Sequence, residues 1–226
     1  MLSLKSLQVG RPGPDEVKIH QTFIGVNFID IYCRTGYFPM VPTPHGILWM
    51  EAVGEIVEVG EEVSEFREGD RVGYACVPPG AYCSHRNMPE DRLVQLPQDL
   101  PDELAASLLL KGFTASFLLH EVIRFKSGDW ILIHAAAGGV GSLLSQWAKA
   151  KGAQVIGTVS NSEKARIARE QGCDHTVIYT QENFVESVRQ ITSDEGVSVV
   201  FDAVGKDNIA DSIEALRPCG QLVSFG

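Results

Sequence analysis

The stretch that decides the fold is WILIHAAAGGVGSLLSQWAKAKGAQVIGTV, residues 130–159. It begins with the short apolar run WILIHA (130–135), which predicts a buried strand. Apolar residues then recur at helical spacing through GVGSLLSQWAKAKG (139–152), whose last glycine is a typical helix stop. QVIGTV (154–159) reads as a second strand. A strand, a helix and a strand in this order predict one βαβ unit.

The same alternation continues to residue 226. Strands and helices are predicted in turn at EKARIAREQG (163–172), HTVIY (175–179), 182–192, VSVVFDAV (197–204), about 209–216, and QLVSFG (221–226). Short buried strands that alternate with helices predict an α/β fold with a doubly wound parallel sheet, of the Rossmann type. A six-stranded nucleotide-binding sheet would need one more helix and strand, so we expect this sheet to be incomplete at its C-terminal end, with an exposed edge.

The composition changes near residue 105, which predicts two domains, 1–105 and 106–226. The first is rich in glycine and proline between β-branched and aromatic stretches. These stretches are VKIHQTFIGVNFIDIY (17–32), EAVGEIVEVG (51–60), DRVGYACV (70–77) and DRLVQLP (91–97). Their spacing predicts a small irregular barrel or sandwich.

Charge and cysteine usage exclude several classes of protein. The 226 residues carry a net charge of −10 with no dense basic run, which argues against a nucleic-acid partner. No apolar run approaches the ~20 residues that span a bilayer, and MLSLKSLQVGRPGPDE (1–16) has no secretory signal. Five cysteines without a CxxC pair indicate free thiols, so we expect a cytoplasmic protein.

The glycine-rich turn after the first Rossmann strand is the sharpest chemical feature. Gly138, Gly139 and Val140 begin the helix, and small residues there let the backbone approach a pyrophosphate. The backbone N–H groups and the helix dipole would face its negative charge. Gly141 would let the helix pack closely on the strand. The alternative is a plain tight turn between strand and helix.

The end of the second strand indicates which nucleotide binds. NAD-binding folds place an acidic residue about 20 residues after the glycine turn, and none stands here. Ser160 can donate to a 2′-phosphate, and Lys164 or Arg166 can neutralise it, which favours NADP. The alternative is that Ser160 and Glu163 form only a helix capping box.

Taken together, these motifs resemble a known family. The segments that carry the resemblance are GVNFIDIYCRTGYFP (25–39), EAVGEIVEVGEEV (51–63), FREGDRVGY (66–74), KGFTA (111–115), HAAAGGVGSLLSQWAKAKGA (134–153) and VFDAVG (200–205). In this order and spacing the chain is similar to the zinc-independent medium-chain dehydrogenases/reductases, specifically the NADPH:quinone oxidoreductases or zeta-crystallin-like proteins. The resemblance covers nearly all of the chain.

The resemblance implies a GroES-like first domain, a Rossmann second domain and NADPH as cofactor. It implies that Asn27 and Tyr32 line the nicotinamide and substrate site. The other implied cofactor contacts are Thr114, Gly138, Gly139, Val140, Ser160, Lys164, Tyr179, Val204, Gly205, Phe225 and Gly226. From the residue types alone, Asn27 and Tyr32 could hydrogen-bond a quinone or enone oxygen, or could be a turn residue and a core aromatic.

The chain also departs from its wider superfamily. Zinc-dependent relatives need a cysteine where Asn27 stands and a histidine where Met50 stands, so we expect no metal site. The family usually has glycine at the position of Trp49, where an indole would either obstruct the substrate site or change the loop. The chain begins later and ends earlier than the family pattern, which predicts a truncated form. The family's dimers use the missing sheet edge, so we expect a homodimer only if that edge is supplied.

Three functions fit these residues. The first is NADPH-dependent reduction of quinones. The second is reduction of an enone or alkenal double bond, because the same motifs serve both reactions. The third is a truncated, non-catalytic NADPH-binding protein. Hydride transfer needs no acid–base triad, since the cofactor supplies the difficult step.

Overall fold

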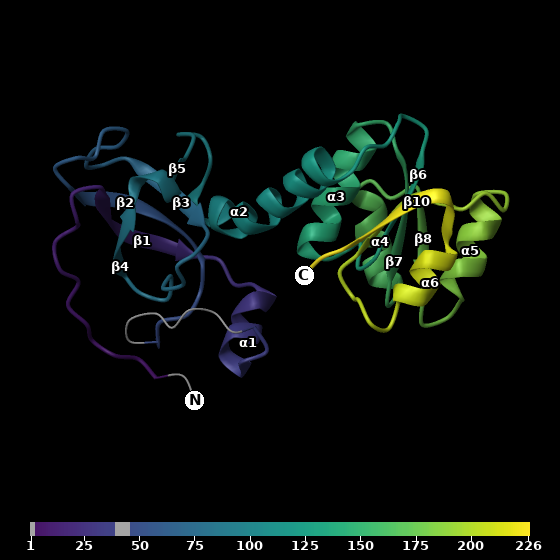
Figure 1. The fold of residues 1–226 in the computed structure, drawn as a ribbon, viewed down its shortest axis with the longest axis horizontal. Coiled ribbons are helices and arrows are strands. Elements are labelled where there is room, and N and C mark those ends of the chain that lie inside the picture. Colours follow the sequence, from purple (N-terminus) through teal and green to yellow (C-terminus); the bar gives the residue numbers. More distant parts are fainter. Residues whose placement is uncertain (1–2, 39–45) are drawn as a thin grey trace. The chain divides into compact units, whose positions relative to one another are not determined.

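The structure, a computed structural model, describes residues 3–38 and 46–226. Its contacts divide the chain into two compact units, unit 1 (Met1–Leu110) and unit 2 (Lys111–Gly226) (Figure 1). The division falls inside helix α2 (Asp102–Phe117), whereas the sequence placed it after residue 105. The two units are described separately below.

Unit 1 is built on an antiparallel sheet with the strand order β4-β1-β2-β3-β5. Its strands are β1 (Glu16–Ile24), β2 (Glu51–Val59), β3 (Arg71–Ala75), β4 (His85–Pro89) and β5 (Val94–Gln95). Side chains on β1 alternate between buried and exposed, as expected for a strand with one face on a core. Val17 and Ile19 lie in that core with Ile56 and Tyr74.

The predicted strand stretch 17–32 is confirmed as β1 up to Ile24 and is wrong at its end. Residues 28–32 are part of helix α1 (Phe28–Thr35), although their β-branched and aromatic side chains favour a strand. Local contacts decide the matter. The Asp30 carboxylate accepts a hydrogen bond from the backbone N–H of Asn27 at 2.7 Å, which caps the helix start. Gly36, at a φ of 78°, ends the helix in the left-handed conformation.

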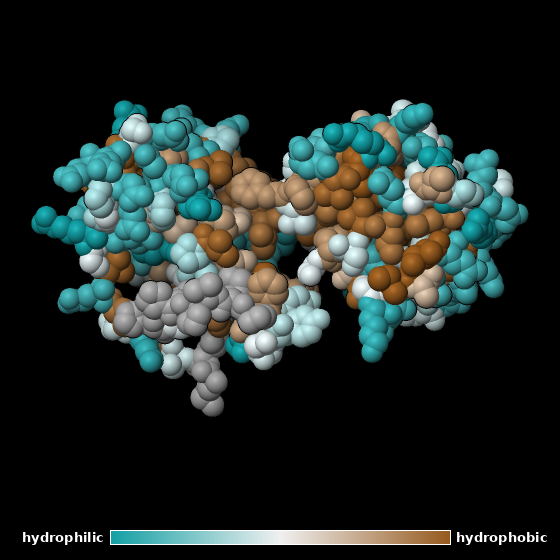
Figure 2. Space-filling view, in the orientation of Figure 1, coloured by the Kyte–Doolittle hydropathy of each residue, from teal (hydrophilic) through white to brown (hydrophobic). Residues whose placement is uncertain are grey.

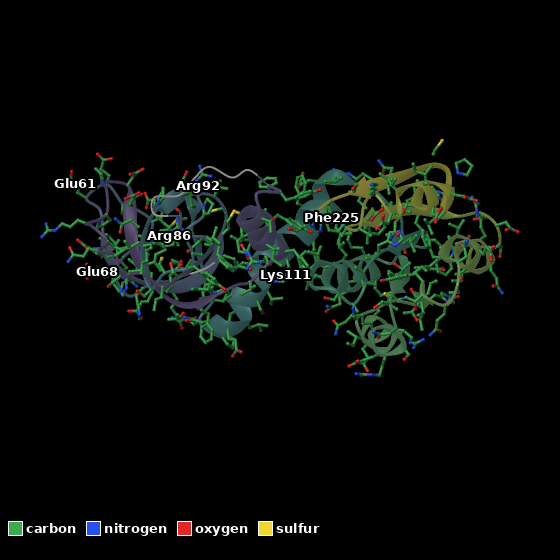
Figure 3. The ribbon with its side chains drawn as sticks, turned by 90° about the horizontal axis from the view of Figure 1, so that it is seen from below. Glu61, Glu68, Arg86, Arg92, Lys111 and Phe225 are labelled. Carbon is green, nitrogen blue, oxygen red and sulfur yellow. The ribbon has the colours of Figure 1, made fainter. Side chains whose placement is uncertain are left out.

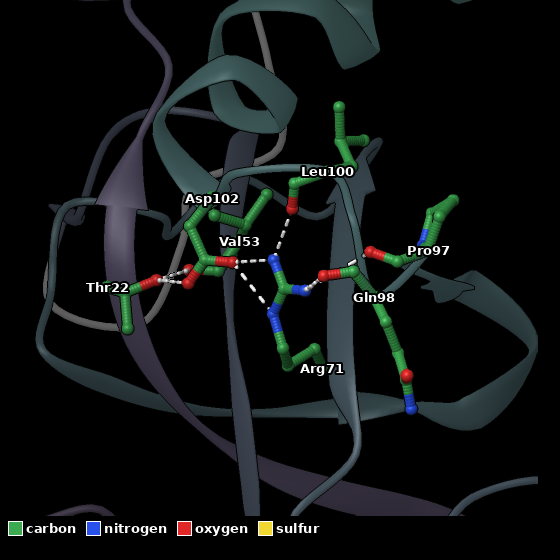
Figure 4. Close-up of polar contacts among 7 residues, drawn as sticks. All are labelled: Thr22, Val53, Arg71, Pro97, Gln98, Leu100 and Asp102. Carbon is green, nitrogen blue, oxygen red and sulfur yellow. Dashed lines mark hydrogen bonds and ion pairs between the residues drawn. The ribbon is translucent and has the colours of Figure 1, made fainter.

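An ion pair ties the start of α2 to the sheet of unit 1 (Figure 4). The Asp102 carboxylate accepts hydrogen bonds from the Arg71 guanidinium and, at 2.7 Å, from the Thr22 hydroxyl. The same guanidinium donates to the Leu100 carbonyl at 2.5 Å. Burial raises the pKa of Asp102, but the hydrogen bonds and the charge of Arg71 outweigh it and lower that pKa overall.

Unit 2 has a parallel sheet in the order β10-β9-β6-β7-β8. Its elements after α2 are the one-turn π-helix η3 (Leu118–Val122), β6 (Trp130–Ile133), α3 (Gly139–Ala150), β7 (Gln154–Val159), α4 (Ser162–Glu170), β8 (His175–Ile178), α5 (Phe184–Ile191), β9 (Val197–Asp202), α6 (Ile209–Glu214) and β10 (Leu216–Ser224). The predicted alternation and the predicted parallel sheet are confirmed. Unit 1 also contains the short helix η2 (Glu90–Arg92).

Alternate residues of the parallel strands face two separate cores. Ile131 and Ile133 of β6 pack with α3 and α4, whereas Leu132 packs with Phe184 and Val188 of α5. Both faces of the sheet are therefore covered, which explains the continuous apolar runs seen in the sequence. The loops described below follow the carboxyl ends of these strands.

Strand β10 forms an edge of this sheet. Leu222 and Val223 on it are half-buried, and Figure 2 shows hydrophobic side chains gathered over the part of unit 2 where α3 and β10 lie. Within β10 the pairing with β9 is interrupted between Leu216 and Gln221. Cys219 lies in this interruption with a φ of 63°, a conformation that favours glycine. In the described residues no helix is both long and apolar enough to cross a membrane.

Candidate functional site

Helix α3 begins without a side-chain cap. Its N-cap is Gly138, which has no side chain to accept a hydrogen bond from the first N–H groups of the helix. By contrast, α4 and α5 are capped by the side-chain oxygens of Asn161 and Asn183. The first turn of α3 therefore keeps donors that an anionic ligand can use, at the positive end of the helix dipole.

The backbone approaches this helix start very closely. A Cβ at Gly141 would lie 2.4 Å from the Ala135 carbonyl oxygen, so only glycine fits. Ala135 itself has a φ of 50°, an uncommon left-handed conformation for a residue with a side chain. Strain of this kind persists only where the surrounding structure enforces it. The close packing predicted for Gly141 is present in the structure.

Lys111 lies against the same turn. A Cβ at Gly139 would meet the Cδ atom of Lys111, a residue labelled in Figure 3, at 2.6 Å. The lysine stem therefore occupies the space over this glycine. The small residue at 139 thus accommodates a side chain of α2. Gly138 and Gly139 are both exposed, and Val140 is half-buried.

The alternative interpretation of Ser160, as the cap of α4 in a capping box with Glu163, is wrong, because the cap is Asn161. Its Oδ1 atom accepts from the Lys164 backbone N–H at 2.9 Å. Ser160 is half-buried one residue before the cap, and the Lys164 side chain is exposed. Tyr179, which follows β8, is half exposed. Ser160, Lys164 and Tyr179 thus lie at the neighbouring ends of β7 and β8.

Asp202 organises the loop after β9. Its Oδ1 atom accepts from the backbone N–H groups of Val204 and Gly205 at 2.7 and 2.9 Å. Its carbonyl oxygen accepts from the Phe225 N–H at 3.0 Å. The two strand-end segments that hold predicted cofactor contacts, 204–205 and 225–226, are therefore both held by one buried residue.

A buried histidine links three of these strand ends. His134, which follows β6, contacts the Thr158 hydroxyl through Nδ1 at 2.8 Å and the Ser212 hydroxyl through Nε2 at 3.0 Å. Ser212 donates to Asp202 at 3.2 Å. Burial lowers the pKa of His134, although the negative charge of Asp202 opposes that shift. This network was not predicted, because its members are far apart in the sequence.

In unit 1, Asn27 and Tyr32 lie at the start and in the middle of α1. Asn27 is half-buried, and its Nδ2 atom donates to the Glu51 carboxylate at 2.6 Å. Tyr32 is half-buried in a group of tilted rings, with Phe28 at 6.5 Å and Tyr37 at 5.4 Å between centroids. Asn27 is thus more than a turn residue bonded to local backbone. The contact between Glu51 and Asn27 was not predicted from the sequence.

Trp49 is accommodated inside unit 1. It has a φ of 73°, which suits the glycine usual in the family better than tryptophan. Its carbonyl accepts from the N–H groups of Gly80 and Ala81, and its ring stacks on Tyr82. The side chain is only 8% exposed and belongs to the core of this unit, although its indole N–H has no partner among the described residues. The indole is therefore buried in unit 1.

The structure collects most of the predicted cofactor residues at one edge of the parallel sheet. Apart from Thr114, the predicted cofactor residues of unit 2 lie in the segments that follow β6, β7, β8, β9 and β10. The carboxyl ends of these parallel strands meet at the same edge of the sheet. Thr114 lies apart from them in the sequence, on α2, and is half-buried. Among residues 3–38 and 46–226 no cluster of histidine, cysteine, aspartate and glutamate could hold a metal ion.

Comparisons with known proteins agree with this arrangement. Residues 13–98 match the alcohol dehydrogenase GroES-like domain, and residues 139–226 match a family described as zinc-binding dehydrogenase. These two domains in this order define the medium-chain dehydrogenase/reductase class.

Individual relatives indicate which family within this class the chain resembles. The chain is 46% identical to a quinone oxidoreductase of Pseudomonas aeruginosa, over 100% of this chain and 69% of the relative. It is also 46% identical to a 2-haloacrylate reductase of Burkholderia sp, over 98% and 68%. A crystal structure of Escherichia coli quinone oxidoreductase complexed with NADPH superposes with a TM-score of 0.94 at 40% identity, over 98% of this chain and 68% of that one.

The chain therefore belongs to the zinc-independent quinone oxidoreductase family of medium-chain dehydrogenases/reductases, a family of oxidoreductases. It spans a little over two thirds of the length of the first two relatives named above. The predicted GroES-like and Rossmann folds are confirmed by these matches.

Proposed function

We propose that this chain reduces quinones with NADPH. The observation that carries the proposal is the uncapped, glycine-lined start of α3, next to a β7 end that has no acidic residue. An uncapped helix start suits a pyrophosphate, and the missing acid with Lys164 nearby suits a 2′-phosphate. The complex of the Escherichia coli relative with NADPH supports the same nucleotide.

Each group of residues has a separate task in this proposal. Gly138, Gly139 and Val140 hold the pyrophosphate through backbone N–H groups. Ser160, Lys164 and Tyr179 hold the 2′-phosphate and its ribose. The remaining contacts flank the nicotinamide, and they are Thr114, Val204, Gly205, Phe225 and Gly226. NADPH, when bound, supplies a hydride, and the quinone takes up that hydride and a proton from solvent to become a hydroquinone.

Asn27 and Tyr32 are proposed to bind the substrate oxygen. A carboxamide N–H and a phenol O–H can both donate to an oxygen that gains negative charge. The tilted aromatic rings around Tyr32 offer faces on which a planar quinone can stack. The free thiols of all five cysteines fit the predicted cytoplasmic location. The homodimer, expected only if the sheet edge is supplied, stays a prediction.

A titration with NADPH and NADH, followed by nucleotide fluorescence, tests the cofactor. We expect Lys164→Ala to weaken NADPH binding by between about 10- and 100-fold, since a charge-assisted hydrogen bond contributes roughly 1.5–3 kcal/mol, and to leave NADH binding unchanged. Arg169→Ala is the matched control, because it removes the same charge from the last turn of the same helix. Equal binding of both nucleotides by the unaltered chain would contradict the proposal.

A second substrate class has its own support, the 46% identity to a 2-haloacrylate reductase. That relative's name describes reduction of an activated double bond, so the same site could reduce an enone or alkenal. Turnover of 1,4-benzoquinone, an enone and 2-chloroacrylate, each with NADPH, separates the two classes. Activity on the acrylate with none on the quinone would replace the first proposal by the second. NADPH binding without turnover of any of them would favour the predicted non-catalytic protein.

A further inference from the structure

Glu51 is a buried carboxyl group with no assigned role. It begins β2 and is 0% exposed. Burial of a carboxylate is costly unless several donors satisfy its oxygens, and an apolar residue of similar size would often stabilise the fold as well. Stability alone therefore does not explain a buried carboxylate at position 51, and its contacts indicate another function.

Each oxygen of Glu51 accepts from a different element of unit 1. Oε2 accepts from Nδ2 of Asn27 at 2.6 Å, and Oε1 accepts from the backbone N–H of Leu110 in α2 at 2.7 Å. The carboxyl group therefore joins the start of α1 to α2. Its backbone carbonyl also accepts from the Gly25 N–H at 3.0 Å, two residues before Asn27.

The surroundings leave the carboxyl group little freedom. A Cβ at Gly25 would lie 2.1 Å from Oε2 of Glu51 and 2.4 Å from the Ala106 carbonyl oxygen. Glycine is thus needed at 25 to make room for the carboxyl group beside α2. Because the Leu110 N–H fixes one oxygen and packing fixes the rest, Glu51 presents its second oxygen to Asn27 in one direction.

A carboxylate accepts hydrogen bonds and cannot donate them, so it determines which end of the Asn27 carboxamide faces it. The amide nitrogen must point to Glu51, and the amide oxygen must point elsewhere. The backbone of Asn27 is fixed independently, since its N–H donates to Asp30 at 2.7 Å. Main chain and side chain of Asn27 are therefore held by two separate carboxyl groups.

We propose that Glu51 is a positioning residue that orients the Asn27 carboxamide for the reaction. The inference rests on the proposed function, in which Asn27 binds the substrate oxygen. Glu51 does not bind the substrate in this proposal and acts through the Nδ2 contact. A misplacement of about 1 Å in such a group can slow a reaction by as much as about 100-fold.

The test begins with Glu51→Gln, which keeps the shape but places an NH2 group against one of two N–H donors. We expect kcat with NADPH and 1,4-benzoquinone to fall between about 10- and 100-fold. We expect KM for NADPH to change by less than about threefold, since the nucleotide contacts lie in unit 2. Asp102→Asn is the matched control, because it removes the other carboxylate that joins α2 to the rest of unit 1, one that pairs with Arg71 and not with Asn27. It should lower the melting temperature and leave kcat within about twofold.

A double-mutant cycle separates positioning from a purely structural role. In an Asn27→Ala background, Glu51→Gln should have no further effect on the single-turnover rate, because its route of action is already lost. The same fold-loss in both backgrounds, or an unchanged kcat in the single variant, would overturn the proposal. Should Glu51→Gln not fold, Glu51→Met replaces it, since an apolar residue of this length fits a buried site.

A spectroscopic readout keeps the contact testable without turnover. The two Nδ2 proton resonances of Asn27, assigned by their loss in Asn27→Ala, should be widely separated by the hydrogen bond to a carboxylate. The separation should collapse in Glu51→Gln and persist in Asp102→Asn. Resonances that ignore the Glu51 substitution would refute the contact. Absence of NADPH-dependent turnover in the unaltered chain, with the resonances responding as expected, would refute the proposed function alone.

Discussion

The two units bury polar side chains in different ways. In unit 2, the network of His134, Thr158, Ser212 and Asp202 joins the ends of neighbouring parallel strands to α6. In unit 1, Glu51 joins Asn27 to Leu110 of α2, and Asp102 at the start of α2 pairs with Arg71 and Thr22. The members of these pairs are 24 to 80 positions apart in the chain. The first arrangement orders a single edge of a sheet, and the second holds separate elements together.

This difference shows how each unit positions its candidate site residues. A parallel sheet brings the carboxyl ends of its strands to one edge, so that unit 2 positions several loops through its topology alone. An antiparallel sheet has no such edge. Unit 1 therefore positions Asn27 through a specific contact with Glu51, and one substitution there should have a local effect. The predictions below test this contrast.

The largest effect is expected for Gly141→Ala in unit 2. The new Cβ would lie 2.4 Å from a backbone oxygen that cannot move aside easily. We expect the free energy of unfolding of unit 2 to fall by about 3 kcal/mol. NADPH binding, followed by nucleotide fluorescence, should be lost with it.

Gly112→Ala is the control for that substitution. Gly112 lies in α2, and a Cβ there would meet no atom within 4 Å. Alanine should therefore leave binding intact and stabilise the helix by up to ~1 kcal/mol. Normal NADPH binding by Gly141→Ala would contradict the described packing of the α3 start.

A substitution at Trp49 tests unit 1 in the same way. Trp49→Ala should lower the free energy of unfolding of unit 1 by ~3 kcal/mol through lost packing. Trp49→Gly should cost about 1 kcal/mol less, because glycine accepts the φ of 73° without strain. Hydrogen exchange of unit 1 peptides across a urea series measures both. An alanine variant more stable than the glycine variant would show that the backbone strain at 49 is absent.

A pH series should affect unit 2 before unit 1. Burial lowers the pKa of His134 below its usual 6.5, so the unfolded chain binds this proton more readily than the folded one. Stability that is complete above about pH 6.5 is then lost on acidification, at most by about 1.4 kcal/mol per pH unit. Urea unfolding at pH 7.5 and 5.5, read from Trp130 and Trp147 in Trp49→Phe, measures it.

Unit 1 should respond at more acidic pH. The pKa of Asp102 is lowered from 3.8, so its contribution is present at neutral pH and is lost only as the pH falls through the lowered value. Trp49 fluorescence in a Trp130→Phe/Trp147→Phe variant follows this unit. An equal loss of stability in both units at pH 5.5 would contradict the predicted difference between them.

The smallest effect is a gain. Cys219 has a φ of 63° and is exposed, so Cys219→Gly should stabilise unit 2 by about 1 kcal/mol. Cys219→Ala, which keeps the strain, should not. Thermal unfolding of the three proteins distinguishes them, and equal melting temperatures for glycine and alanine would argue against strain at this residue.

The same contrast explains what the sequence could predict. The alternation of strands and helices from β6 to β10 follows from local apolar runs and glycine stops and was predicted, whereas α2 and η3 were not. The fold and the family were confirmed. Within the predicted strand stretch 17–32, residues 28–32 are helical because propensity favours β while Asn27, Asp30 and Gly36 favour a helix.

The missed site features share one cause. Glu51 contacts Asn27 and Leu110 across 24 and 59 positions, and His134 contacts Ser212 across 78. Periodicity and motif spacing carry no information on such pairs. The one local miss, the cap of α4, involved adjacent candidates, Ser160 and Asn161, that only the geometry separates. The roles of the predicted site residues remain to be tested by the experiments above.

The exposed thiol on β10 gives the chain a natural labelling site. Burial raises the pKa of Cys33, Cys76, Cys83 and Cys173, so these four offer little thiolate at neutral pH. Cys219 is the one exposed cysteine of the five, all of which lie in described residues. A maleimide dye should react there first. Because the dye would stand on an edge strand, its emission would report any chain that comes to pair with that edge.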